Sequence, residues 1–134
     1  MELKTTMTAD LQGHFLRLYQ MALTDSEFSP SEWKMLYEFA ENRGIGKLEL
    51  DRVFLTHTGP ITIPQNVETR LEYLYDLCRL IWADGKVTED ERTTLHKFCR
   101  KFEFEDVNVT ELCDFLLGAA ETKRPFHELL TELN

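Results

Sequence analysis

The sequence predicts an all-α fold, a single compact domain of about seven helices built from two pseudo-repeats. Apolar residues recur at steps of three and four along most of the 134-residue chain, which is the helical period. Strand-like alternation is confined to the short segment 61–63. The chain also matches itself, without a gap, when it is shifted by 59 positions. Self-similarity at a fixed period indicates repeated structural units.

The repeat is clearest around two acidic loops. The shift places Asp25 on Asp84 and Glu32 on Glu91, and the flanking apolar positions agree in kind. Those apolar pairs are Phe15 with Leu74, Leu18 with Leu77, Leu36 with Leu95, and Phe39 with Phe98. We interpret this agreement as two copies of one helical unit.

The chain is expected to form one domain over residues 1–134. The pseudo-repeats span about 9–56 and 64–118, and a C-terminal helix follows at about 124–133. Because neither half has enough apolar surface to be stable alone, both should share one core.

The first repeat is predicted to hold three helices. The first begins near Thr8 or Ala9 and ends near Thr24, because its apolar residues line one face. The next starts at Ser29-Pro30-Ser31-Glu32, which supplies a serine cap, a proline at the first helical position and a glutamate three residues after the cap. Gly44 supplies the left-handed residue at its end. A shorter helix spans roughly Lys47 to Thr56.

The segment from His57 to Asn66, with two prolines and a glycine, interrupts the helical pattern and joins the repeats. A longer helix of about four turns then runs up to Asp84-Gly85. Thr88 with Glu91 predicts a capping box at the start of the following helix.

Two more helices are predicted toward the C-terminus. Asn108 with Glu111 is expected to cap a short helix that carries Leu112 and Phe115. Pro125 is expected to start the last helix, because proline fits the first helical position.

The net charge of −9, without any long basic run, argues against nucleic acid as a partner, because binding phosphates requires a basic face. Cations, or basic or apolar protein surfaces, fit this charge better. No apolar run approaches the roughly 20 residues that span a bilayer, and the N-terminal residues lack a signal peptide. These features predict a cytoplasmic protein without direct membrane insertion.

Patterns that indicate catalysis are sparse. The four histidines form no HExxH pattern and no i, i+4 pair with another histidine or cysteine, so local sequence does not support a zinc site. Surface or hydrogen-bonded histidines are expected instead. Cys78, Cys99 and Cys113 are expected to be reduced, packed thiols, without the basic neighbours that activate a nucleophile. The sequence therefore predicts a protein that is not an enzyme.

The segment LIWADGKVTEDERTTLHKFCRKF, residues 80–102, resembles the TerB-like tellurite-resistance family. Members of that family carry a helix that ends in an Ala-Asp-Gly loop and is followed by a helix containing a glutamate. The segment MALTDSEFSPSEWKMLYEFAENRGI is similar to the same unit in weaker form, with Ser26 in the place of Gly85. The resemblance implies an all-helical, internally duplicated fold of bacterial tellurite and chemical-stress systems, found also within a membrane-anchored DnaJ-like co-chaperone.

The resemblance also implies a metal site in the acidic loops. Carried over residue by residue, its ligands would be Asp25, Glu32, Asp84 and Glu91. Such a set suits Mg²⁺ or Ca²⁺ better than Zn²⁺. Each residue also has a structural explanation, because both glutamates stand at capping-box positions and both aspartates stand at turns. A calcium-binding EF-hand is not predicted, because apolar residues occupy its first and third ligand positions.

Together these features predict a TerB-like binding module of a tellurite or chemical-stress response. It would bind an unidentified protein partner and a divalent cation. The alternative is a carboxylate-based, metal-dependent enzyme, which requires the two acidic loops to converge. Like charges in one site would then raise the pKa of a carboxyl group and make acid–base chemistry credible.

Overall fold

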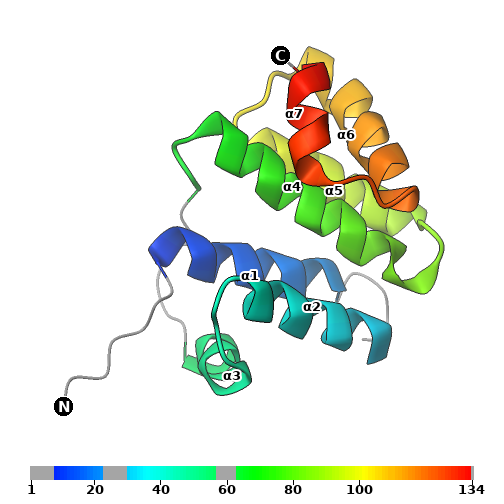
Figure 1. Cartoon of the computed structure of the whole chain (residues 1–134). Coiled ribbons are helices and arrows are strands. Elements are labelled where there is room, and N and C mark those ends of the chain that lie inside the picture. The colour runs from blue at the N-terminus through cyan, green and yellow to red at the C-terminus, as the bar shows by residue number, and fades with distance from the viewer. Residues whose placement is uncertain (1–7, 23–29, 57–62, 134) are drawn as a thin grey trace.

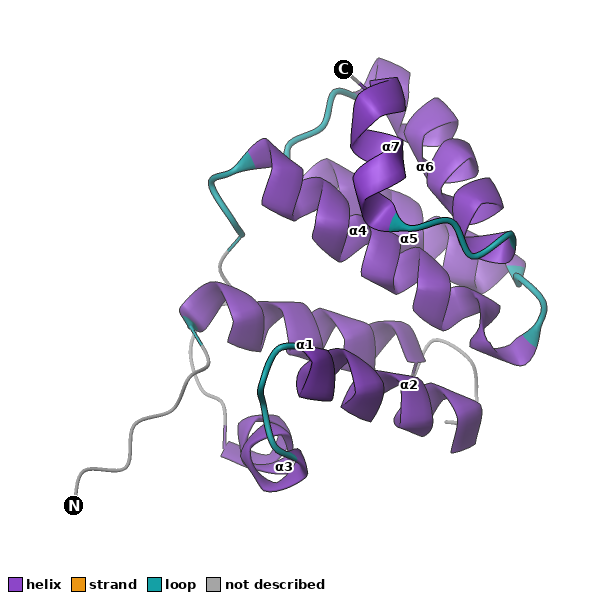
Figure 2. Ribbon diagram, in the orientation of Figure 1, coloured by secondary structure: helices purple, strands orange, loops and turns teal. Residues whose placement is uncertain are grey.

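The computed structural model describes residues 8–22, 30–56 and 63–133. Within these ranges the regular structure is helical and includes no strand, which confirms the all-α prediction (Figure 2). The first three helices are α1 (Ala9–Ala22), α2 (Pro30–Asn42) and α3 (Lys47–Thr56). The other four are α4 (Val67–Ile81), α5 (Glu89–Lys101), α6 (Asp106–Glu121) and α7 (Phe126–Leu133). A 3₁₀ turn, η1 (Trp82–Asp84), extends the end of α4.

α4 is the central helix of the domain. In Figure 1, α1, α2 and α3 lie below it, α6 and α7 lie above it, and α5 lies behind it. α4 packs against α1, α2, α5, α6 and α7. Nine of its 15 residues are buried, and the face that carries Glu72 and Arg79 stays partly exposed.

The buried apolar residues form one continuous cluster to which every helix contributes. Phe15 of α1, Leu77 of α4 and Phe102 at the end of α5 are fully buried within it. One shared core of this kind explains why the chain forms a single domain, because burial of apolar surface is the main favourable contribution to folding.

The start of α5 and the end of α2 follow the predicted capping residues. The Thr88 hydroxyl accepts a hydrogen bond from the Glu91 N–H at 3.1 Å, and a Glu91 carboxylate oxygen accepts one from the Thr88 N–H at 3.0 Å. This confirms the capping box. Gly44 ends α2 with a φ of +74°, which confirms its predicted left-handed conformation. The predicted cap Ser29 and the predicted end of α1 at Thr24 lie outside the described residues.

The prediction for the start of α6 is wrong. Asn108 does not cap this helix but lies inside its first turn, where its N–H donates to the Glu105 carbonyl at 2.8 Å. The helix begins at Asp106, two residues after Phe104, whose N–H donates a hydrogen bond to the Cys99 carbonyl at 3.3 Å. Closure of this turn against α5 sets the start of α6, and no side chain caps it.

Several features of the two halves recur 59 residues apart. α2 and α5 both have 13 residues and start at Pro30 and Glu89, and α3 and α6 start at Lys47 and Asp106. The turn after α2 is closed by a hydrogen bond from the Ile45 N–H to the Ala40 carbonyl at 2.9 Å, as Phe104 and Cys99 close the turn after α5. Superposition of the two halves through an approximate two-fold remains a prediction.

The three cysteines are buried and form no disulfide, which confirms packed, reduced thiols. Burial raises the pKa of the Cys78 thiol, which keeps this side chain protonated at neutral pH. Among the described residues, no helix combines the length and the apolar character needed to cross a membrane.

Candidate functional site

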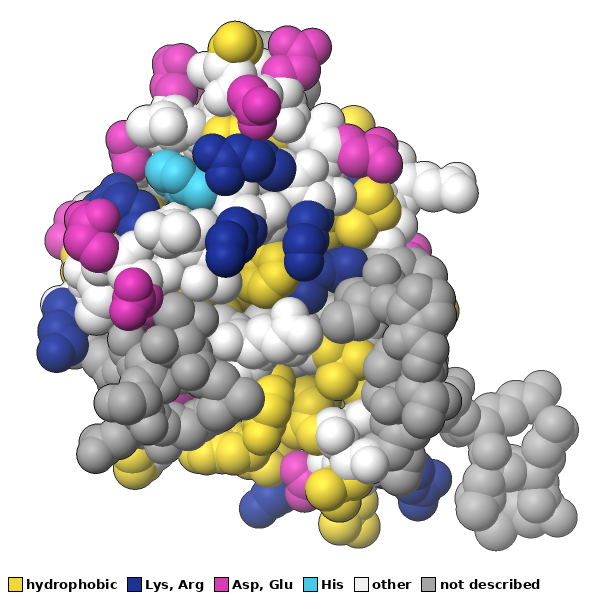
Figure 3. All heavy atoms as spheres, turned by 180° about the vertical axis from the view of Figure 1, so that it is seen from behind, with side chains coloured by type: hydrophobic (Ala, Val, Ile, Leu, Met, Phe, Trp, Pro, Cys, Tyr) yellow, Lys and Arg dark blue, Asp and Glu magenta, His cyan; other side chains and the backbone are white. Residues whose placement is uncertain are grey.

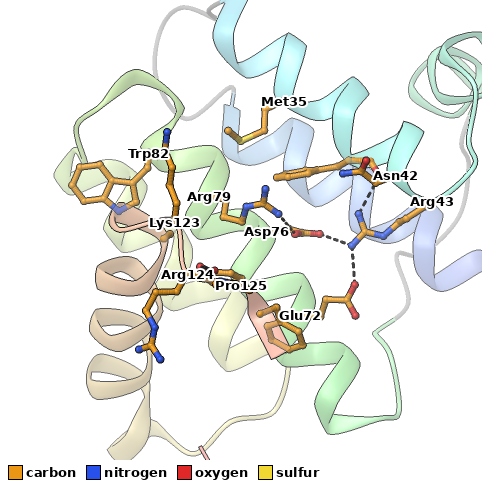
Figure 4. A pocket seen from close by; sticks show the side chains of 14 residues that line it. Met35, Asn42, Arg43, Glu72, Asp76, Arg79, Trp82, Lys123, Arg124 and Pro125 are labelled. Atoms are coloured by element: carbon orange, nitrogen blue, oxygen red, sulfur yellow. Dashed lines mark hydrogen bonds and ion pairs between the residues drawn. The ribbon is translucent and has the colours of Figure 1, made fainter. Parts of the chain in front are cut away.

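A cleft of about 610 Å³ opens between α2, the second half of α4 and the turn that joins α6 to α7 (Figure 4). α2 and the residue after it contribute Met35, Phe39, Asn42 and Arg43. α4 and η1 contribute Glu72, Tyr75, Asp76, Arg79 and Trp82. The α6–α7 side contributes Ala120, Lys123, Arg124, Pro125 and Phe126. The cleft therefore lies where residues from both halves of the chain meet.

Aromatic side chains form much of the cleft wall, and two of them are held by hydrogen bonds. The Trp82 indole N–H donates to the Leu117 carbonyl at 2.8 Å. The Tyr75 hydroxyl donates to the Arg124 carbonyl, and its ring stacks on Phe126 with ring centroids 6.0 Å apart. These contacts hold the Tyr75 and Trp82 rings in place on the cleft wall.

Asp76 stands at the centre of a buried ionic network. Its Oδ2 atom accepts hydrogen bonds from His14 Nε2 at 2.8 Å and from Arg43 Nη2 at 2.6 Å. Its Oδ1 atom lies 3.7 Å from Arg79 Nη1. Arg43 Nη2 also donates to Glu72 at 3.1 Å. The network joins α1, the end of α2 and α4, so it holds together the elements that form one side of the cleft.

The pKa shifts show which members of this network are charged. Burial by itself would raise the pKa of Asp76, but the hydrogen bonds and charges of His14 and Arg43 outweigh it and lower the pKa. Burial lowers the pKa of His14 despite the opposing effect of Asp76. At neutral pH the imidazole is therefore uncharged, and its Nε2–H donates to a carboxylate whose charge is balanced by Arg43.

The cleft carries four basic side chains and two acidic ones, in a chain whose net charge is −9. Two of the four are held by strong ion pairs. Arg43 is held by Asp76 and Glu72, and Arg124 Nη2 lies 2.7 Å from Glu132. In Figure 4 the Arg124 side chain extends away from the Lys123 side chain, on the far side of the turn.

The other two basic side chains are more open. Arg79 lies over the Phe39 ring with 4.8 Å between its guanidinium carbon and the ring centroid, and its side chain is 45% exposed. Lys123 is exposed and forms no ion pair with a described side chain. Arg79 and Lys123 are therefore the basic groups of the cleft best placed to meet an incoming ligand.

Basic side chains also occur on another face of the protein. Figure 3 shows the side opposite to the view of Figure 1, where Lys and Arg side chains border an apolar area. α5 lies on that side and carries the exposed residues Lys97, Arg100 and Lys101. Lys97 lines none of the described clefts, which makes it a suitable control position for a change of charge.

The structure describes the four predicted metal ligands only in part. Glu91 is buried and its carboxylate occupies the capping box, and Glu32 is buried in the first turn of α2. Asp25 and the side chain of Asp84 lie outside what the structure describes. Within the described residues there is no group of three or more His, Cys, Asp or Glu side chains that could hold a metal ion.

The described elements that adjoin the two acidic loops in sequence lie at the same end of the bundle. The end of α1, the start of α2 and the connection from α4 to α5 all lie on the right in Figure 1, and η1 packs against α2. Glu32 and Glu91, in the first turns of α2 and α5, therefore lie toward the same end of the bundle (Figure 1). Convergence of all four carboxylates in one site remains a prediction.

Sequence reasoning did not identify the ionic network or the cleft. His14 pairs with a residue 62 positions away and Arg43 with one 33 positions away, so no local motif contains them. One signal was present, because Asp76 stands directly between Tyr75 and Leu77 within an otherwise buried helical stretch. A buried carboxylate there requires a partner.

No family model, curated protein or solved structure matches this chain. The assignment to a class therefore rests on the chain itself, an all-α domain with a cleft that has aromatic walls and basic side chains at its rim.

Proposed function

We propose that this chain is a non-enzymatic, TerB-like binding module that acts in the cytoplasm during a tellurite or chemical-stress response. In this proposal the cleft between α2, α4 and the α6–α7 turn receives a segment of a partner protein. The single observation that carries it is the cleft itself, because its volume of about 610 Å³ and its aromatic walls are typical of binding sites.

The chemistry of the cleft supports binding more than catalysis. None of its lining residues is a serine, threonine, cysteine or histidine, so the usual nucleophile and base are missing from the lining. Its carboxylates, Glu72 and Asp76, are already ion-paired with Arg43. Asp76 is a poor general base, because its ion pairs and hydrogen bonds lower a pKa that is ordinarily already below neutral pH.

The divalent cation and the carboxylate-based enzyme stay as predictions for the acidic loops. Both depend on Asp25 and Asp84, whose side chains the structure does not describe. For Glu91 the hydrogen bonds to Thr88 supply a complete structural explanation. A cation would therefore have to share that carboxylate with the helix cap.

The proposal can be tested by photo-crosslinking in cells. A photo-reactive amino acid in place of Met35, which lines the cleft, should yield a discrete crosslinked protein. The same amino acid in place of Lys97 on α5 should not yield that product. The captured protein is then purified and its direct binding to this chain is measured. Failure to crosslink at Met35, or equal crosslinking at both positions, would overturn the proposal.

A further inference from the structure

Arg79 and Lys123 are the basic side chains of the cleft that no close ion pair holds. The lining residues carry four cationic groups and two carboxylates, but Arg124 also pairs with Glu132 and Glu128, so cations and carboxylates at the cleft balance. Basic groups without a close carboxylate, in a concave and partly apolar site, attract a ligand of the opposite sign. An occupant that contacts these two groups should therefore be negatively charged.

Arg79 and Lys123 are held less closely than the other two basic side chains of the cleft. Arg43 and Arg124 each hold carboxylates of the chain itself, at 2.6 and 2.7 Å. Arg79 contacts Asp76 only at 3.7 Å and lies over the Phe39 ring. Figure 4 shows Arg79 on α4 and Lys123 on the α6–α7 turn on neighbouring sides of the opening, with Trp82 beside them. A carboxylate between these two cations would meet an aromatic surface at the same time.

The backbone conformation of Lys123 is unusual for a lysine. Its φ of +58° is left-handed, and the turn is closed by hydrogen bonds from the Lys123 N–H to the Ala120 carbonyl and from the Arg124 N–H to the Ala119 carbonyl. Glycine is the common residue at this position after a helix, because a side chain is disfavoured there. A lysine that adds no described ion pair to the fold leaves this cost uncompensated, and such strain is concentrated at functional sites.

We infer that Arg79 and Lys123 form a clamp for the carboxylate of an acidic peptide segment, with an apolar side chain of that segment against Phe39, Trp82 and Phe126. This inference rests on the proposed function and specifies the chemistry of the partner. The cleft volume accommodates a few side chains. A nucleic acid would demand more than two available cations, because its affinity comes from many phosphate contacts.

The occupant is therefore a segment in which aspartate or glutamate alternates with leucine or phenylalanine. The aromatic walls contribute apolar burial, and the two cations select for the acidic residues. The net charge of the chain favours basic or apolar partner surfaces. The segment that enters the cleft is instead expected to be acidic.

The test uses the full chain and a defined probe, the acetylated and amidated hexapeptide Asp-Leu-Glu-Asp-Phe-Glu. Binding is followed by NMR through the indole N–H signal of Trp82, with the Trp33 signal as an internal reference. The peptide should shift the Trp82 signal saturably. The neutral counterpart Asn-Leu-Gln-Asn-Phe-Gln should bind about tenfold more weakly or worse, because it lacks the charges that the clamp recognises.

The decisive variant is Lys123→Gly, since stability and binding should change in opposite directions. The melting temperature should rise by about 2–4 °C, because glycine relieves the left-handed conformation. The affinity for the acidic peptide should fall about twofold to fivefold, the range expected for one partly exposed charge pair. Arg79→Ala should cause a loss of similar size, and Lys123→Asn, which also tolerates a left-handed backbone, should reproduce the loss.

Two controls match this variant. Glu103→Gly relieves the same strain at the end of α5, where φ is +68°, and should raise the melting temperature without changing the affinity. Lys97→Ala removes one exposed positive charge outside the cleft and should leave the affinity unchanged. An equal loss with Lys97→Ala would show that only the overall charge matters and would overturn the clamp.

Two other outcomes also overturn the inference. The first is equal binding of the neutral and acidic peptides, and the second is binding of inorganic phosphate at the clamp without binding of the peptide, which would indicate a small-anion site. The crosslinking experiment separates these failures from failure of the proposed function. A partner that crosslinks at Met35 but binds equally well to the Lys123→Gly variant would leave the binding module in place and remove only the acidic clamp.

Discussion

Two contacts between the halves of the domain occupy positions that differ by 59 residues but use different chemistry. Arg43 binds Asp76 through an ion pair of 2.6 Å. The residues 59 positions from this pair are Phe102 and Arg17, and the Arg17 guanidinium lies over the Phe102 ring at 4.9 Å. Each contact links one half of the chain to the other.

The pKa values of the two arginines shift in opposite directions. Burial lowers the pKa of Arg17. The same effect acts on Arg43, but the adjacent carboxylates of Asp76 and Glu72 outweigh it and raise the pKa. Arg43 and Asp76 line the cleft, whereas Arg17 and Phe102 are buried in the core. Two residue pairs whose numbers differ by 59 thus make contacts of different chemistry, an ionic one beside the cleft and a cation–aromatic one within the core.

The largest effect is expected from Asp76→Ala. Removal of this carboxylate leaves Arg43 and His14 without their buried partner and should cost about 3–5 kcal/mol of unfolding free energy in urea denaturation. Arg17→Met, which removes the charge over Phe102 but keeps an apolar side chain, should cost about 1–2 kcal/mol. Equal losses of unfolding free energy for Asp76→Ala and Arg17→Met would show that the ionic and the aromatic contact do not differ in their contribution to stability. The double variant Asp76→Leu with Arg43→Met should recover part of the loss, because the buried charges are removed together.

The second prediction concerns pH and His14. The pKa of His14 in the folded protein lies below its ordinary value of 6.5, so the unfolded chain binds the proton first on acidification. Stability should therefore be complete above pH 6.5 and fall below it, by at most about 1.4 kcal/mol per pH unit from this residue. The lowered pKa of Asp76 adds a further loss below about pH 5.

His14→Gln isolates the histidine contribution, because the amide can donate to Asp76 without titrating. Urea denaturation at pH 7.5, 6.5 and 5.5 should show a smaller decline for the variant than for the wild type. The same decline in both would mean that His14 is not the group responsible. Arg17 and Arg43 also act on this imidazole, and both disfavour its protonation.

A smaller effect should show whether Glu91, at the second acidic loop, only caps α5 or also binds a cation. Glu91→Ala should lower stability by about 0.5–2 kcal/mol, with chelator or with millimolar Mg²⁺ or Ca²⁺, if the carboxylate only caps α5. If Asp84 and Glu91 bind a cation, the wild type should gain about 2.7 kcal/mol at a hundredfold excess over the dissociation constant. Thermal melts of Asp84→Asn and Glu91→Gln complete the test, since both should then lose that gain.

The smallest expected effect compares the ends of α2 and α5. Gly44 and Glu103 both have a positive φ, of +74° and +68°. Gly44→Ala should destabilise by about 1 kcal/mol through backbone conformation alone, since nothing lies within 4 Å of the added methyl group. Glu103→Gly should stabilise by about 0.5 kcal/mol. Chemical denaturation of both variants checks the signs, and a stabilising Gly44→Ala would show that the two turns are not equivalent.

The sequence predicted those features that depend on neighbours along the chain. The capping box at Thr88, the turn at Gly44 and the helical class all follow from residues within one or two helical turns. The start of α6 was missed because a hydrogen bond from Phe104 back to Cys99, rather than a side-chain cap, determines it.

The cleft and its ionic network could not be predicted for a related reason. The charge of Asp76 is balanced by groups from α1 and from the end of α2, which only folding brings together. The role of Lys123 depends on a backbone angle that its residue type does not suggest. The family resemblance directed attention to the acidic loops, whereas the described cleft lies among basic and aromatic side chains.

The central position of α4 also has a kinetic consequence. A helix that packs against helices on both sides of it in the sequence cannot finish docking until the segments before and after it have both arrived. Docking on α1 closes a long loop, whereas docking on α5 and α6 joins neighbouring segments, and loop closure of this kind slows folding. We expect the rate-limiting step to be the arrival of α1 on a preassembled unit of α4, α5 and α6. Truncation of Leu77 would then slow folding, whereas truncation of Leu50 on α3 would mainly speed unfolding.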